Sequence, residues 1–94
     1  MRFEWDPRKG AANRRKHGVT FDEAESVFFD DAARLYDDPD HSAEEERYLL
    51  LGLSVELRVL VVAHCVRERG EVVRIISARR ATRAETEVYV GGQP

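Results

Sequence analysis

The stretch that decides the fold spans residues 72–89 and reads VVRIISARRATRAETEVY. Its first half is rich in β-branched residues and predicts a strand. Its second half opens with Thr82 and Glu85 in the T-x-x-E pattern of a capping box, which predicts a helix to about residue 90. Arg79 therefore stands where a strand ends beside a helix start. Free backbone N–H groups at a helix N-terminus favour an anion, so this junction is a candidate phosphate site.

Strand-like runs precede this junction at regular spacing. Residues 67–70 contain a glycine and predict a hairpin turn between the last two runs. The spacing predicts an antiparallel meander, and an alternating start at residues 2–5 adds a short strand. The four runs of the meander lie at residues 33–36, 46–53, 57–66 and 72–79.

Two helices are predicted between the first strand and the meander. Asp6, which is followed by proline, is a helix cap, and Gly18 is a C-terminal stop, so the first helix ends at about residue 17. Thr20 and Glu23 repeat the capping-box pattern and begin the second helix. The order of elements predicts an α+β fold with one domain over residues 1–94. It consists of an antiparallel four- to five-stranded sheet with two N-terminal helices and one C-terminal helix.

The bulk composition restricts the class of protein. With 43% hydrophobic and 35% charged residues, the chain is globular rather than disordered. A single cysteine, Cys65, excludes an intramolecular disulfide and indicates a reducing, cytoplasmic setting. The longest apolar run, residues 59–65, is far shorter than the roughly 20 residues that span a bilayer, so we expect no membrane contact. The histidines lack the spacing of metal ligands, and we expect no metal and no cofactor.

The charges are strongly segregated along the chain, although the net charge is only −3. Residues 8–18 contain five basic residues and no acid, and residues 67–83 contain six arginines against two glutamates. Between them, residues 22–46 contain eleven acids and one arginine. This pattern suits a cationic surface for a polyanion and an anionic surface for a basic partner. The alternative is that both are ordinary solvated faces.

An ordered set of short motifs covers nearly the whole chain and resembles the BrnT family. The motifs are Phe3-Glu-Trp-Asp6, Lys9, Asn13, Lys16-His-Gly-Val19, Phe21-x-x-Ala24-x-x-Val27-Phe28, Glu46-Arg47, Arg74-Ile-Ile-Ser-Ala-Arg79 and Ala81-Thr82-x-x-Glu85-x-x-x-Tyr89.

The resemblance implies a toxin of a bacterial type II toxin–antitoxin system with a RelE-like fold. Such a toxin cleaves RNA without a metal cofactor, inhibits translation and growth, and is neutralised by a BrnA-type antitoxin. It meets operator DNA only indirectly, through the DNA-binding part of the antitoxin.

Metal-independent RNA cleavage requires a base for the 2′-hydroxyl, cations for the charge at phosphorus and an acid for the leaving oxygen. Arg79 is the first candidate for the cation, given the resemblance. Arg47 could bind phosphate beside Glu46 as a base, although the two could instead form an ordinary ion pair at a sheet edge. Histidine is the side-chain type suited to proton transfer near neutral pH, which makes His17 a candidate acid or base, but it could also simply stabilise the C-terminus of its helix. These four residues are the candidate catalytic set.

The candidate RNA-binding residues are Lys9, Lys16, Arg74, Arg80 and Tyr89. Arg74 and Arg79 have opposite parity along the strand, so we expect them to lie on different faces of the sheet, with Arg80 on the face of Arg74. Arg80 could equally be part of an exposed basic rim, and Tyr89 could pack its ring on the sheet. The capping box already accounts for Thr82 and Glu85.

Two other functions fit the same arginines. The first is a non-enzymatic module that presents the strand–helix junction to nucleic acid and the acidic segment to a protein such as an antitoxin. The second is a catalytically decayed toxin that is kept as the structural partner of an antitoxin. The sequence leaves both open beside the ribonuclease.

Overall fold

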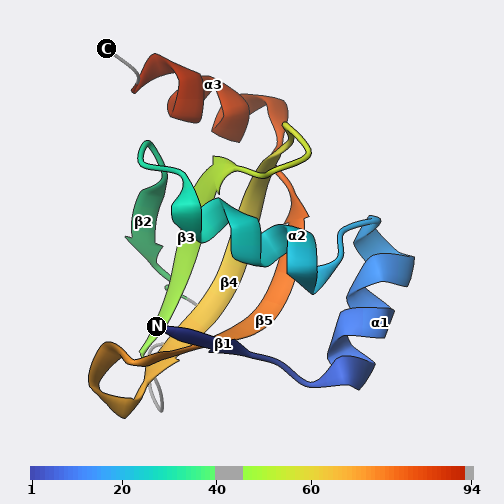
Figure 1. Cartoon of the computed structure of the whole chain (residues 1–94). Helices are drawn as coiled ribbons and strands as arrows, with labels where there is room; N and C mark the ends of the chain where they lie inside the picture. The colour runs from blue at the N-terminus through green and yellow to red at the C-terminus, as the bar shows by residue number, and fades with distance from the viewer. Residues whose placement is uncertain (40–45, 93–94) are drawn as a thin grey trace.

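The structure, a computed structural model, describes residues 1–39 and 46–92. Within these residues, three helices and two short 3₁₀ turns accompany a five-stranded sheet (Figure 1). The elements are β1 (Arg2–Glu4), α1 (Pro7–His17), α2 (Phe21–Ser26), η1 (Val27–Phe29), β2 (Arg34–Asp37), β3 (Arg47–Leu53), β4 (Val59–Arg67), η2 (Glu68–Gly70), β5 (Val72–Arg80) and α3 (Arg83–Gly91). The predicted α+β fold is confirmed. The part of the acidic loop at residues 40–45 lies outside the described residues.

The sheet is mixed rather than wholly antiparallel. Its strand order is β1-β5-β4-β3-β2, and β2 to β5 form the predicted antiparallel meander. The short β1 instead runs parallel to β5, with Phe3 opposite Val73. The expectation of an antiparallel β1 was wrong because the strand pattern of residues 2–5 carries no information about a partner that lies far away in the chain.

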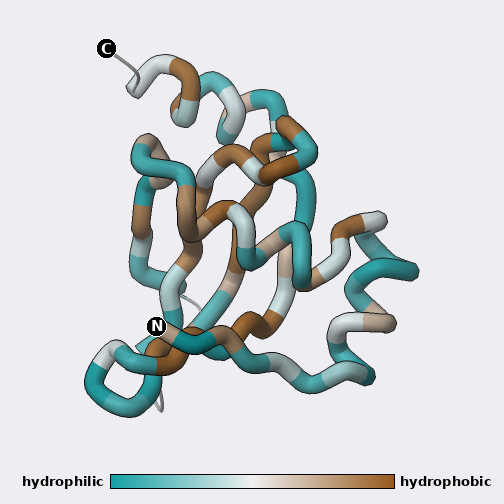
Figure 2. The backbone as a smooth tube through the Cα atoms, in the orientation of Figure 1, coloured by the Kyte–Doolittle hydropathy of each residue, from teal (hydrophilic) through white to brown (hydrophobic). Residues whose placement is uncertain are grey.

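One face of the sheet, here called the core face, is covered by the N-terminal half of the chain. Its strand residues include Leu50, Leu60, Val62 and Ile75, which are buried against Val27 of η1 and against apolar residues of α2. The brown segments of the central strands meet the α2 region in Figure 2. Burial of this face supplies most of the apolar contact that holds the fold together.

Helix α1 is almost entirely hydrophilic and lies beside the free edge of β5 (Figures 1 and 2). Asn13 fixes it there. Its side-chain amide donates to the carbonyl oxygens of Ala78 and Val19, at 2.8 and 2.9 Å, and accepts from the Ala78 N–H at 3.0 Å. Asn13 thus satisfies an edge-strand backbone as a further strand would. A polar helix is held by one buried amide rather than by an apolar stripe.

The predicted capping box at the start of α2 is only half present. The Glu23 N–H donates to the Thr20 hydroxyl at 3.1 Å, as expected. The Glu23 carboxylate, however, is 4% exposed and accepts from the Ser54 hydroxyl at 2.7 Å and from the Arg58 guanidinium. The hydrogen bond from Arg58 holds the pKa of Glu23 below its usual value. The buried Glu23 carboxylate pairs with Arg58 rather than capping its own helix. A buried carboxylate without a partner would destabilise the fold by roughly 3–5 kcal/mol.

A β-bulge in β5 changes which side chains share a face. Ile75 lies opposite His64 and Ser77 lies opposite Ala63, so Ile76 is an extra residue without a cross-strand partner. The bulge reverses the alternation of side chains beyond it. The expectation that Arg74 and Arg79 lie on different faces was therefore wrong, because it assumed an uninterrupted strand.

The second face of the sheet, here called the open face, is only partly covered. Helix α3 crosses one end of it, at the top of Figure 1. Tyr89 of this helix is 8% exposed and packs with Leu51 and Val61. Within residues 1–39 and 46–92, no helix has the length and apolar character needed to cross a membrane.

Candidate nucleic-acid interface

Two arginines flank the centre of the open face near the start of β5. Arg47 lies opposite Cys65 on β4, and Cys65 lies opposite Arg74 on β5. Directly opposed residues point to the same face, and adjacent strands are about 4.8 Å apart. Arg47 and Arg74 therefore stand on the open face with their backbones about 10 Å apart.

A second row of the same face ends in two further arginines. Arg34 lies opposite Leu51, Leu51 lies opposite Val61, and Val61 lies opposite Arg79. The row between them, from β2 to β5, consists of Tyr36, Leu49, Ala63 and Ser77. The open face thus has an apolar middle with cations around it. We call Arg34, Arg47, Arg74 and Arg79 the arginine frame.

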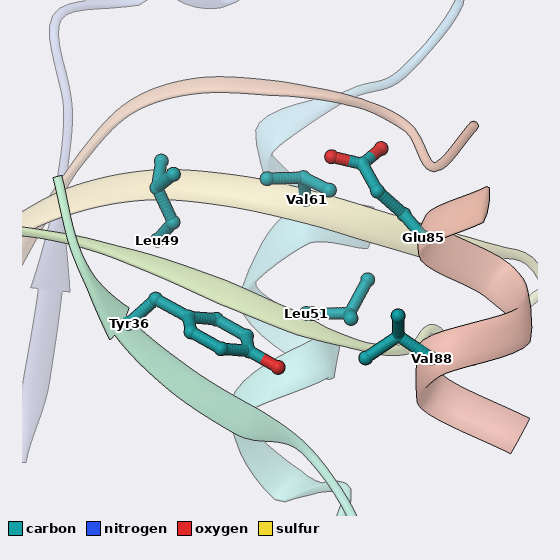
Figure 3. A pocket seen from close by; sticks show the side chains of 6 residues that line it. All are labelled: Tyr36, Leu49, Leu51, Val61, Glu85 and Val88. Carbon is teal, nitrogen blue, oxygen red and sulfur yellow. The ribbon is translucent and has the colours of Figure 1, made fainter. Parts of the chain in front are cut away.

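A groove of about 370 Å³ lies inside this frame (Figure 3). Its floor is apolar, one wall is the edge strand β2, and the other is α3. Among the described residues that line it, Glu85 carries the one carboxylate. The lining residues are Tyr36, Leu49, Leu51, Val61, Glu85 and Val88.

Arg79 is held by Glu85 in a bidentate ion pair. The two guanidinium nitrogens lie 2.7 and 2.9 Å from the two carboxylate oxygens. The hydrogen bond from Arg79 lowers the pKa of Glu85 to about 2, and that from Glu85 raises the pKa of Arg79. Glu85 also completes the predicted capping box with Thr82, which is confirmed. A phosphate that binds Arg79 must compete with this carboxylate.

Arg74 also has a carboxylate partner. Its guanidinium donates to Glu4 of the neighbouring β1 at 2.6 Å, and Arg67 approaches the same oxygen at 4.0 Å. The side chain of Arg74 is about a third exposed, so it retains donors toward solvent. The parallel pairing of β1 with β5 places this glutamate beside the arginine.

Glu46 and Arg47 are adjacent in sequence but point apart. The Glu46 carboxylate accepts a hydrogen bond from the Tyr48 hydroxyl at 3.0 Å, and this bond raises the pKa of Tyr48. Tyr48 lies opposite the buried His64, on the core face. Because alternate residues share a face, Glu46 belongs to that side while Arg47 is on the open face.

The remaining basic candidates divide between α1 and the end of β5. Lys9 and Lys16 are exposed on α1, and His17 is half-buried at its C-terminus. Asn13, which is one turn before His17, bonds Ala78, so the end of α1 lies near the end of β5. Arg80 lies opposite Leu60 and so does not share a face with Arg74, contrary to expectation. The bulge is again the reason.

Tyr89 is a buried anchor of α3. Its hydroxyl donates to Asp30 at 2.7 Å, and burial, together with this bond, raises the pKa of Tyr89 to about 12. Burial raises the pKa of Asp30, but hydrogen bonds from the Leu53 N–H, from Tyr89 and from the Ala32 N–H outweigh it and leave a net lowering. The ring packs on the sheet, which was the structural alternative for this residue.

Sequence reasoning missed Arg34, Tyr36 and the groove. No local signal marks them, because Arg34 and Tyr36 belong to a short edge strand whose register decides their face. Among the residues that the structure describes, no group of three or more His, Cys, Asp or Glu side chains could hold a metal ion.

The fold and the cationic open face define a small protein suited to hold a polyanion, and comparison with known proteins identifies its class as the ribonuclease toxins. A family described as the ribonuclease toxin, BrnT, of type II toxin–antitoxin systems matches residues 5–85. The chain belongs to the BrnT toxin family, as its motifs predicted.

A solved structure supports this assignment. The crystal structure of the Brucella abortus ribonuclease toxin BrnT superposes with a TM-score of 0.69 at 25% sequence identity. The similarity covers 88% of this chain and 99% of the Brucella chain. No curated protein sequence gives a significant match.

Proposed function

We propose that this protein is a metal-independent endoribonuclease that cleaves RNA by attack of the 2′-hydroxyl and thereby inhibits translation and growth. The observation that carries the proposal is the bulge at Ile76, which places Arg74 and Arg79 on the face that also carries Arg47. Arginine binds phosphate through a planar fork of donors, so three arginines on one face suit an RNA backbone. The membership of the chain in a ribonuclease toxin family supports the same function.

We assign the cation of the transition state to Arg79. It lies beside the N-terminus of α3, where the backbone dipoles of the first turn add to the positive potential. Charge that builds on the phosphoryl oxygens would be stabilised there by the Arg79 guanidinium once the phosphate has displaced Glu85 from it. Arg47 and Arg74, on the row nearer the start of β5, would hold the adjoining phosphates.

His17 is our candidate for proton transfer at this junction. The end of α1 lies near the end of β5, since Asn13 bonds Ala78 directly before Arg79. From Asn13 to His17 the helix rises only about 6 Å. Glu46, the other candidate base, lies on the core side at the opposite end of the sheet and accepts the hydrogen bond of Tyr48. Lys9, Lys16 and Arg80 would add electrostatic attraction along the flank.

Cleavage of RNA in the presence of a chelator tests the proposal. We expect cleavage by purified protein free of any partner, and a loss of roughly 10²–10³-fold in Arg79→Ala. Arg69→Asn is the control, because it removes the same charge in the turn η2, and asparagine tolerates the left-handed backbone found there. If Arg79→Ala cleaves as fast as Arg69→Asn, the assignment of Arg79 is wrong.

A non-enzymatic binding module is the second candidate. The carboxylates of Glu4 and Glu85 already occupy Arg74 and Arg79, which suits binding by exchange of partners as well as it suits catalysis. RNA binding without cleavage, under conditions where the protein is folded, would favour this module. A decayed toxin would in addition fail to arrest growth when expressed alone.

We propose that a BrnA-type antitoxin neutralises the protein by covering the arginine frame, and that operator DNA is contacted only through the antitoxin. A segment lying over the open face would exclude RNA from Arg47 and Arg79. Addition of the antitoxin should therefore displace bound RNA. A complex that still bound RNA with unchanged affinity would place the antitoxin on another surface.

A further inference from the structure

The groove inside the arginine frame contains an aromatic ring that phosphate binding does not require. Tyr36 is 42% exposed, although its neighbours across the strand, Leu49 and Leu51, are largely covered. In Figure 3 its ring lies along the β2 wall of the groove, above the floor formed by β3 and β4. It belongs to neither of the two apolar clusters of the core. Within the described residues, this large aromatic side chain thus lines the groove while lying outside both clusters.

We propose that this groove is a nucleobase subsite, in which one base of a single-stranded RNA stacks on Tyr36. The inference rests on the proposed function and adds the form of the substrate to it. Proteins that read unpaired RNA commonly stack splayed bases on aromatic rings beside a cationic path for the backbone. Here the ring and the apolar floor lie inside the arginine frame, which supplies that path.

The size of the groove favours one base rather than a duplex. Its volume of about 370 Å³ lies at the lower end of the range of small-molecule pockets, roughly 300–1,000 Å³. It is bounded by β2 on one side and α3 on the other, so paired strands could not reach the floor. An unpaired base that is turned out from the RNA backbone can reach the floor. The substrate class is therefore RNA with at least one unpaired nucleotide.

Charge complementarity favours RNA over an apolar protein segment as the occupant. Arg34 and Arg79 end the row that crosses the floor, and Arg47 lies beyond Leu49 on the same strand. Within the described part of the groove lining, Glu85 is the one acid, and it is bound to Arg79. Arg79 is neutralised by Glu85 in the free protein, so an anionic backbone gains charge contact here where it displaces this carboxylate, whereas an uncharged segment would gain only from the floor.

Binding of short RNA isolates the subsite from catalysis. The probe is a fluorescein-labelled tetranucleotide with 2′-O-methyl groups, which lack the attacking hydroxyl, and its affinity is read by fluorescence anisotropy. We expect Tyr36→Ala to weaken binding by about 5- to 100-fold, the range for loss of one base–aromatic stack. Tyr36→Phe keeps the ring and should bind within twofold, on the order of 0.4 kcal/mol. Leu35→Ala is the matched control, because Leu35 precedes Tyr36, is exposed and points to the other face.

An abasic nucleotide, moved through each position of the probe, identifies stacking directly. At one position it should weaken binding to the wild type while leaving binding to Tyr36→Ala almost unchanged, because both changes remove the same contact. The subsite is refuted if no position shows this coupling, or if Tyr36→Ala binds like the wild type. A variant that loses affinity for the antitoxin but not for RNA would assign the groove to protein and also refute it.

Cleavage of unmodified RNA, measured in parallel, separates this inference from the proposed function. If the wild type cleaves and Tyr36→Ala cleaves with unchanged KM, the ribonuclease function stands and the subsite is wrong. If the wild type binds the probe with the expected coupling but does not cleave, the subsite stands and the enzymatic function is wrong.

Discussion

Replacement of Glu85 by glutamine should make the protein bind RNA more tightly. A phosphate that binds Arg79 competes with Glu85, whose carboxylate occupies two of the guanidinium donors at 2.7 and 2.9 Å and neutralises its charge. Glutamine has the same shape and can still accept the Thr82 N–H bond of the capping box. The variant therefore removes a charge while leaving the start of α3 intact.

The expected gain follows from the strength of the ion pair. Hydrogen bonds to charged groups contribute about 1.5–3 kcal/mol when well shielded, whereas exposed pairs contribute under about 1 kcal/mol. The side chains of Arg79 and Glu85 are 41% and 32% exposed, which places this pair nearer the lower limit. A competition energy of about 1 kcal/mol corresponds to roughly fivefold tighter binding in Glu85→Gln.

The same variant should change the acid stability of the protein. The pKa of Glu85 is lowered from 4.5 to about 2 in the folded state, so its contribution to stability is complete above pH 4.5 and is lost as the pH falls toward 2. Full conversion of this shift would be about 3 kcal/mol, which solvent screening of the half-exposed pair reduces to about 1 kcal/mol. Glu85→Gln should lose that part of the pH dependence in urea titrations between pH 2 and 5.

Anisotropy measurements of RNA binding test this competition. They compare the wild type, Glu85→Gln, Arg79→Ala and the double variant. In the double variant the gain from glutamine should disappear, because no guanidinium remains to be released. If Glu85→Gln binds RNA no more tightly than the wild type, or if it binds more tightly even without Arg79, then Glu85 does not compete with phosphate for this arginine. The acid titration is independent of RNA and tests the ion pair by itself.

Three substitutions test the framework that supports the face. Asn13→Ala leaves the N–H and carbonyl of Ala78 without their buried partner and should lower the free energy of unfolding in urea by about 2–3 kcal/mol. Arg58→Ala removes the cationic partner of the buried Glu23 carboxylate and should lower the free energy of unfolding by about 3–5 kcal/mol. The loss is measured as a lower midpoint of thermal unfolding. Gly52→Ala would bring its Cβ within 2.8 and 2.9 Å of the side chains of η1 and the following loop. It should cost about 1–3 kcal/mol by overpacking, measured by the same unfolding assay.

Local chemistry made much of the fold predictable from the sequence. The capping box at Thr82 was readable because it satisfies backbone N–H groups three residues apart. The capping box predicted at Thr20 is only half formed, because the Glu23 side chain bonds Arg58, a stronger partner far away in the chain. Tertiary pairing overrides a local motif wherever burial makes an unpaired charge expensive.

The candidate site was harder to predict than the fold. Arg79 was found from its place at a strand–helix junction, but the side on which it lies depends on one unpaired residue, Ile76. A bulge has no reliable sequence signature, and it reverses every later side chain in the strand. Tyr36 was missed for a related reason, since only the register of β2 against β3 brings it to the open face.

Glu85 links the stability of α3 to the chemistry of the open face. One carboxylate caps the helix, neutralises Arg79 and lines the groove, so RNA that displaces it from Arg79 would leave it bonded to the Thr82 N–H alone. The helix would then depend more on Tyr89 and its bond to Asp30. The free energy needed to open the ion pair between Arg79 and Glu85 reduces the binding free energy of any phosphate at Arg79. Affinity for RNA at Arg79 and attachment of α3 are therefore in competition for the same guanidinium.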